Sequence, residues 1–147
     1  MKKILILLFL VSSTVFSQQN YNLKNGFVAG GYDVVSYFNE KPEKGKKKYI
    51  AVVDGVKFKF QSKINFDKFK KSPQKYIPQY GGFCAYAIGK NGEKVTINPK
   101  TFEIREGKLY LFYNSWGTNT LDLWNKEGAK GLKENADKNW KNITAKK

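Results

Sequence analysis

The chain has 147 residues, 41% of them hydrophobic and 16% aromatic, so it can bury the core of one ordinary domain. Its 27 lysine and arginine residues outnumber 12 acidic residues, which gives a formal net charge of +15 at pH 7. The chain has one cysteine and no histidine, and these counts exclude an internal disulfide and a protease-like cysteine–histidine pair.

Residues 1–17 have the pattern of a secretory signal peptide. Lys2 and Lys3 precede an apolar run from Ile4 to Val11, and small residues lead to an expected cleavage after Ser17. The apolar run is too short to span a bilayer, which takes roughly 18 or more apolar residues in succession. We therefore expect export to a periplasm or to the medium, and we expect no transmembrane segment.

The basic charge bears on the partners to be expected. An exported chain without a recognisable nucleic-acid motif is not expected to bind nucleic acid. The lysines are dispersed along the chain, a pattern that favours a generally solvated positive surface. Binding to an anionic polymer or membrane surface stays open as an alternative.

The pattern along the chain divides it into four segments. The signal peptide is followed by a polar leader, 18–30, which contains few large apolar residues. The folded domain is expected over 31–141, since no linker within it is long enough to divide it. A basic tail, 142–147, follows the domain.

A hairpin is the first regular element expected in the domain. The lysine-rich segment 40–48 should be an exposed loop, because it contains Pro42 and Gly45 and no apolar residue. Two β-type runs follow, 49–53 and 56–60, and the residues that join them are Asp54 and Gly55. This residue pair is typical of a two-residue hairpin turn.

Short helices and a second hairpin complete the predicted domain. Ser62 can cap a helix over 63–71, and Ser72–Pro73 can begin another short turn. The remaining predictions are a hairpin over 101–113 around Glu106–Gly107, and closing helices over 121–124 and 129–140. Hairpins mixed with short helices indicate an α+β fold: one small domain with two β-hairpins and several short helices.

The order of these segments resembles that of the exported YHS-domain proteins. The matching stretches are GYDVVSYF, SPQKYIPQYGGFCAYA and TFEIREGKLYLFYN, each in the order in which it occurs in this chain. The resemblance covers about Gly31 to Trp140, and YGGFCAYA is its most specific part. It implies a YHS-like fold and a secreted binding or accessory module in metal or redox homeostasis, with a soft metal such as copper as the cofactor class.

The chain departs from the metal-type relatives that the resemblance brings in. Those modules carry cysteines where this chain has Gln61 and Asn65, and its early turn, 32–35, has no cysteine. Soft metals need thiolate, thioether or imidazole ligands. The chain offers only Cys84, because Met1 leaves with the signal peptide.

Two interpretations of Cys84 stay open. It is either a reactive thiol or soft-metal ligand, or a small buried residue that packs well. In the first case glycine amides and tyrosine hydroxyls would form its surroundings, and Asp33 would receive a cation or orient a tyrosine rather than cap a turn. The candidate pocket then comprises Tyr32, Asp33, Tyr37, Tyr80, Gly81, Gly82 and Tyr86.

Three functions follow as alternatives. The first is the secreted YHS-type module, which is expected to be a binding protein rather than an enzyme. Cys84 is its reactive or soft-ligand residue, and a homodimer or a protein partner completes a metal site. The second is a thiol-redox enzyme that uses Cys84. The third is a cationic module for an anionic polymer or surface. The tryptophans Trp116, Trp124 and Trp140 are expected in the core, with a stacking surface for a sugar or planar ligand as the alternative.

Overall fold

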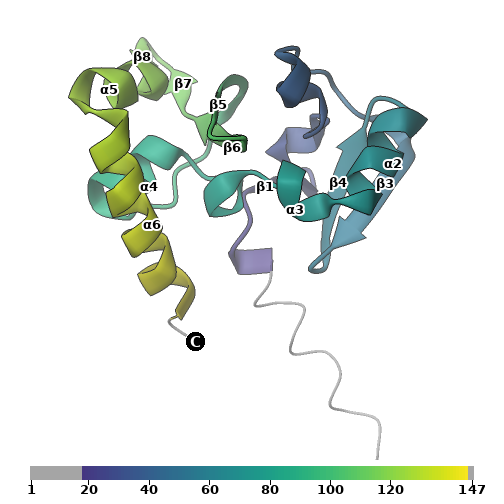
Figure 1. Cartoon of the computed structure of the whole chain (residues 1–147), viewed down its shortest axis with the longest axis horizontal. Helices are drawn as coiled ribbons and strands as arrows, with labels where there is room; N and C mark the ends of the chain where they lie inside the picture. Colours follow the sequence, from purple (N-terminus) through teal and green to yellow (C-terminus); the bar gives the residue numbers. More distant parts are fainter. Residues whose placement is uncertain (1–17, 146–147) are drawn as a thin grey trace, which may run out of the picture.

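A computed structural model describes residues 18–145 of the chain (Figure 1). The predicted signal peptide therefore lies outside the described residues. Within 18–145, no helix is both long enough and apolar enough to cross a membrane. The regular elements are β1 (Leu23–Lys24), β2 (Phe27–Val28), η1 (Ala29–Gly31), η2 (Ser36–Asn39), β3 (Lys46–Val53), β4 (Val56–Phe60), α2 (Lys63–Lys71), α3 (Pro73–Tyr76), η3 (Gln79–Gly82), α4 (Ala85–Asn91), β5 (Asn98–Arg105), β6 (Lys108–Phe112), β7 (Asn114–Ser115), β8 (Thr118–Asn119), α5 (Thr120–Glu127) and α6 (Ala129–Ala145).

The predicted small α+β domain is confirmed, and so are both hairpins. β3 and β4 pair antiparallel through a turn in which Asp54 has φ 52° and Gly55 has φ 74°. β5 and β6 pair in the same way around Glu106 and Gly107, with φ 51° and 70°. Both turns use two successive left-handed residues, the geometry that matches the twist of the flanking strands.

The residues expected as a polar leader contribute two short strands to the first sheet. Its strand order is β1-β2-β4-β3, with β2 parallel to β4. Val28 at the end of β2 is fully buried. Without β2, the backbone groups along that side of β4 would lack strand partners, so the pairing satisfies them and brings segment 18–30 into the fold.

The helices begin close to where the sequence predicts them. Ser62 caps α2, because its Oγ accepts a hydrogen bond from the Asn65 amide at 3.2 Å. α5 starts slightly earlier than expected, after Asn119, whose Oδ1 accepts a bond from the Leu121 amide at 3.1 Å. α6 continues to Ala145, well into the expected tail, because Ile143 still packs against the core.

Strand β6 separates two hydrophobic clusters. Leu109 and Leu111 face the first cluster, which includes the buried residues of β4 and α2. Tyr110 and Phe112 face the second, which lies among α4, α5 and α6. All four side chains are at most 1% exposed, so both faces of this strand are covered. Figure 1 shows the two groups of elements on either side of β5 and β6.

A third, very short hairpin was not predicted. β7 and β8 pair around Trp116 and Gly117, and Trp116 has φ 52° and is 95% exposed. The expectation that Trp116 belongs to the core is therefore wrong. Trp124 is fully buried, and Trp140 is partly buried against the second cluster.

Candidate functional site

Cys84 lies in the interior, immediately before α4. The residue is 0% exposed, and its sulfur does not cap the helix. The Cys84 amide donates to the Val95 carbonyl at 2.9 Å, and Cys84 forms an isolated parallel β-bridge with Leu111 of β6. These contacts fix the start of α4 against the second hairpin.

The sulfur of Cys84 is held by two hydrogen bonds. The Tyr113 amide donates to Sγ at 3.4 Å, and Thr120 Oγ1 lies 3.2 Å from Sγ. The Thr120 hydroxyl donates to the Tyr113 carbonyl at 2.8 Å, so its only hydrogen is used there. The hydrogen between Sγ and Oγ1 must then come from Cys84. A thiol arranged in this way is a donor and an acceptor at once.

A small pocket of about 180 Å³ lies beside Cys84. Cys84 contributes to its lining, although the residue is 0% exposed. Two of its lining residues bind Glu127, which accepts a bond from Lys90 at 2.6 Å and from the Tyr86 hydroxyl at 2.8 Å. The Lys90 bond, followed by the Tyr86 bond, lowers the pKa of Glu127, so Glu127 is anionic and Lys90 is already paired. The pocket is lined by Cys84, Tyr86, Ala87, Lys90, Asn91, Val95, Tyr113 and Thr120.

The structure separates most of the predicted pocket residues from Cys84. Tyr32 and Tyr37 belong to the first cluster, and the Tyr37 hydroxyl donates to the Pro99 carbonyl at 2.6 Å. Of the predicted residues, Tyr86 alone joins Cys84 at the small pocket. Its hydroxyl is bound to Glu127, so it does not donate to the thiol.

Asp33 caps a turn, the alternative to the cation-binding role. It is fully buried, and its Oδ1 accepts bonds from the Val35 and Ser36 amides at 2.9 and 3.3 Å. Its Oδ2 accepts bonds from the Gln61 amide at 2.9 Å and from Asn65 Nδ2 at 2.8 Å. The carboxylate thus joins the loop before η2 to the end of β4 and to α2. Asn65, which stands where the resemblance places a cysteine, serves this junction.

Tyr80, Gly81 and Gly82 form a tight bend between α3 and α4. Tyr80 and Gly81 both have positive φ, 55° and 60°. A Cβ on Gly81 would lie 1.8 Å from the Asn20 carbonyl oxygen, so only glycine fits here. A tyrosine in the left-handed region costs about 1–2 kcal/mol, and such strain is often kept at functional positions.

An open groove of about 630 Å³ lies along this bend. Its walls come from the start of the described chain, the turn of the first hairpin, segment 74–81, the start of β6 and the last turns of α6. The groove combines aromatic rings, amides and charges of both signs. It is lined by Asn20, Tyr21, Asp54, Gln74, Ile77, Pro78, Gln79, Tyr80, Gly81, Lys108, Asp137, Trp140, Lys141 and Thr144.

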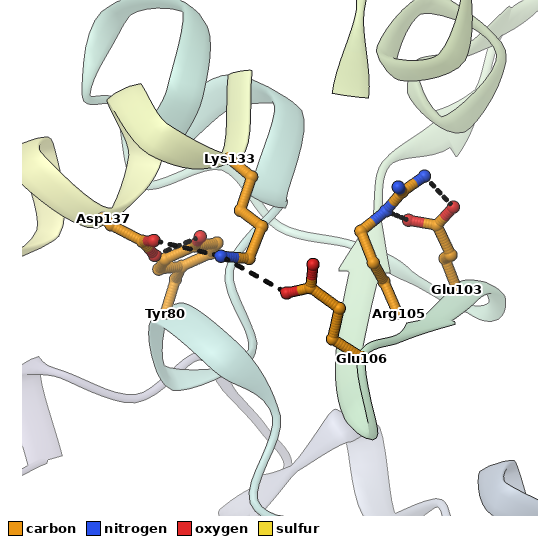
Figure 2. Close-up of polar contacts among 6 residues, drawn as sticks. All are labelled: Tyr80, Glu103, Arg105, Glu106, Lys133 and Asp137. Carbon is orange, nitrogen blue, oxygen red and sulfur yellow. Dashed lines mark hydrogen bonds and ion pairs between the residues drawn. The ribbon is translucent and has the colours of Figure 1, made fainter. Parts of the chain in front are cut away.

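One wall of the groove is fixed by a polar network (Figure 2). The Tyr80 hydroxyl donates to Asp137 Oδ1 at 2.8 Å, and Lys133 Nζ lies 3.4 Å from Asp137 Oδ2 and 3.8 Å from Glu106 Oε2. Burial and then the bond to Asp137 raise the pKa of Tyr80 well above its usual value, so the hydroxyl stays protonated and keeps donating. The Tyr80 ring also lies 6.1 Å from the Trp140 ring, edge to face.

A second ion pair lies beside this network in Figure 2. Arg105 donates to both carboxylate oxygens of Glu103, at 2.9 and 2.8 Å, and the Trp124 indole also donates to Glu103 at 3.1 Å. The bond from Trp124 ties α5 to β5, and Arg105, which lies on the same strand as Glu103, holds the Glu103 carboxylate in place. The pair supports the fold next to the groove and does not line it.

Sequence reasoning grouped Tyr80 and Gly81 with Cys84, whereas the structure places them along the groove. It did not single out Asp137, Lys108 and Tyr21, which also line the groove. These groove residues come from distant segments, so no local motif could join them. Over residues 18–145, no group of three His, Cys, Asp or Glu side chains is arranged to hold a metal ion.

Comparison of the chain with protein-family models, with curated proteins and with solved structures finds no significant match.

Proposed function

We propose that this protein is an exported binding module of the YHS type, and that it holds a small polar ligand in the groove along α6. The observation that carries the proposal is the groove itself. Its volume of about 630 Å³ lies within the range of roughly 300–1,000 Å³ for small-molecule sites. The burial of Cys84, with both of its hydrogen-bonding positions in use, favours binding over thiol catalysis.

The lining of the groove favours a ring-shaped polar ligand such as a sugar. The partly buried Trp140 ring offers flat apolar surface, and the buried Tyr80 ring packs against it edge to face. Asp137 and Lys141 offer an acceptor and donors for hydroxyl groups. Since Asp137 already fixes Tyr80, this wall is preorganised, which lowers the entropy lost on binding.

The three tryptophans provide the experiment. A panel of neutral and N-acetylated mono- and disaccharides is titrated to about 10 mM, since small ligands often bind in the millimolar range. We expect one or more sugars to shift the indole N–H resonance of Trp140 in the groove. The resonance of Trp116, which is 95% exposed outside the groove, should stay in place and serves as the internal control.

An Asp137→Asn variant should bind the same sugar about fivefold more weakly, because the neutral amide accepts the Tyr80 hydroxyl in a weaker hydrogen bond than the carboxylate does. Asp122→Asn is the matched control, since Asp122 is exposed on α5 and does not line the groove. The proposal fails if no sugar shifts Trp140, or if both variants change the affinity equally.

The pocket beside Cys84 favours a second candidate, the thiol function in metal or redox homeostasis. Its volume of about 180 Å³ could admit a soft ion such as Cu(I) or a small oxidant next to Sγ. Such a ligand must first displace the bond between Sγ and Thr120. A metal site shared by the Cys84 thiolates of two chains requires a larger structural change, since each sulfur would have to leave the interior.

Alkylation of Cys84 separates the two candidates. From its burial we expect iodoacetamide to modify the native protein at least about 100-fold more slowly than the protein in urea, because reaction then depends on local opening. The readout is the mass increase with time, with and without Cu(I). If the native protein is alkylated fast and Cu(I) suppresses this reaction, the result supports the thiol function of Cys84 and contradicts the ligand-binding function of the groove.

A further inference from the structure

The face of the first sheet that points away from its core carries a row of alternating basic and apolar side chains. Lys24 pairs with Phe27, Phe27 with Lys57, and Lys57 with Val52, so this row crosses all four strands. A second row pairs Ile50 with Lys59. We call these six residues the basic sheet face.

The alternation along the strands shows that this face is not the core face. In β4, Val56, Phe58 and Phe60 are at most 1% exposed and pack within the first cluster. The residues between them, Lys57 and Lys59, point the other way.

The apolar residues on the basic sheet face are accessible. Val52 is 62% exposed and Ile50 is 38% exposed, although both belong to a regular strand. Lys24 and Lys57 are exposed as well, and in the described part of the chain neither makes an ion pair with a carboxylate. Lys59 Nζ lies 4.0 Å from the centroid of the Phe27 ring, a cation–π contact that holds this lysine above the sheet.

We propose that the basic sheet face docks the protein on an anionic phospholipid bilayer. This inference is independent of the groove ligand. Three lysines on one face and no acid among its six residues complement a negatively charged surface, and the net charge of +15 adds long-range attraction. The aliphatic side chains of Ile50 and Val52 can enter the boundary between headgroups and acyl chains.

A nucleic acid fits this face less well than a bilayer does. Proteins that bind single strands stack bases on exposed aromatic rings along a basic groove. Here the most exposed apolar residues are aliphatic, and the Phe27 ring is covered by Lys59. The face is also the surface of a sheet, and it lines neither of the two pockets described above.

Vesicle co-sedimentation tests the proposal. The protein is purified from an exporting host, its N-terminus is determined by mass spectrometry, and all variants carry the same N-terminus. Equimolar phosphatidylglycerol and phosphatidylcholine vesicles are compared with pure phosphatidylcholine vesicles at low and high NaCl. We expect binding to the anionic vesicles, at least tenfold weaker binding at high salt, and no binding to the neutral vesicles.

Three double variants locate the binding surface. Lys24→Glu with Lys57→Glu should weaken binding at least tenfold. Lys130→Glu with Lys138→Glu makes the same charge change at exposed positions of α6 and should change binding less than twofold. Ile50→Thr with Val52→Thr keeps β-branched residues and all charges, and should weaken binding severalfold. Circular dichroism confirms that each variant is folded.

Three outcomes would overturn the proposal. Equal losses in the two charge pairs would assign binding to net charge alone. Tighter binding to single-stranded DNA, with the same dependence on Lys24 and Lys57, would make the face a nucleic-acid surface. A dimer in light scattering that the Ile50 and Val52 changes dissociate would make the occupant a second copy of the chain.

Discussion

Replacing Asp33 by alanine is expected to lower the free energy of unfolding by about 3–5 kcal/mol. The Asp33 carboxylate is fully buried and accepts hydrogen bonds from three backbone amides and from the Asn65 side chain. Alanine leaves these buried donors without their acceptor. The loss of stability is smaller than the summed free energies of the separate hydrogen bonds. Folding of the variant no longer carries the cost of moving a charged group out of water.

Urea unfolding followed by circular dichroism measures this effect. The free energy of unfolding of Asp33→Asn should lie between those of the wild type and of Asp33→Ala. The amide keeps one acceptor oxygen, but its NH₂ group faces hydrogen-bond donors. Asp67→Ala is the control: Asp67 makes an exposed ion pair with Lys63 at 2.6 Å, and such pairs contribute about 0–1 kcal/mol. If Asp33→Ala is as stable as the control, the carboxylate does not join the two segments as described.

Replacing Trp124 by alanine is expected to cost about 3–5 kcal/mol, the usual range for a large aromatic residue in a core. Trp124 is 0% exposed, and its ring lies 5.5 Å from that of Phe112 and 6.1 Å from that of Tyr110. Its indole also donates to Glu103, so the variant loses a hydrogen bond along with the packing. Such a loss is a large fraction of a typical stability of about 5–15 kcal/mol.

Trp116→Ala is the matched control, because it removes the same side chain at a position that is 95% exposed. We expect this variant to stay within about 0.5 kcal/mol of wild type. Thermal and urea unfolding of both variants provide the comparison. Similar losses in the two variants would mean that the second cluster is not centred on Trp124.

Local patterns predicted the local structure of this chain well. The Asp54–Gly55 and Glu106–Gly107 turns and the Ser62 cap depend on neighbouring residues only, so the sequence was sufficient to find them. The boundaries were less accurate where tertiary contacts extend an element. α6 continues past Trp140 because Ile143 packs against the second cluster. The helical propensity of this segment alone does not set where the helix ends.

The candidate site was harder to predict. Sequence reasoning grouped Tyr32, Tyr37, Tyr80 and Tyr86 around Cys84, but their neighbours are set by the chain path. The hydroxyl of Tyr37 reaches Pro99, that of Tyr80 reaches Asp137 and that of Tyr86 reaches Glu127, in each case more than forty residues away. In each pair the acceptor lies far from the hydroxyl in the sequence, so sequence proximity does not reveal it.

The sequence by itself determined the small α+β domain, its two main hairpins, its basic character and the lack of ligands for a thiol-rich metal site, because these follow from composition and from interactions between near neighbours. Only the tertiary structure decided the burial of Cys84, the four-stranded sheet that includes segment 18–30, the groove along α6 and the basic sheet face. Each of these depends on which distant segments meet, and that is set by the joint packing of two clusters on opposite faces of β6.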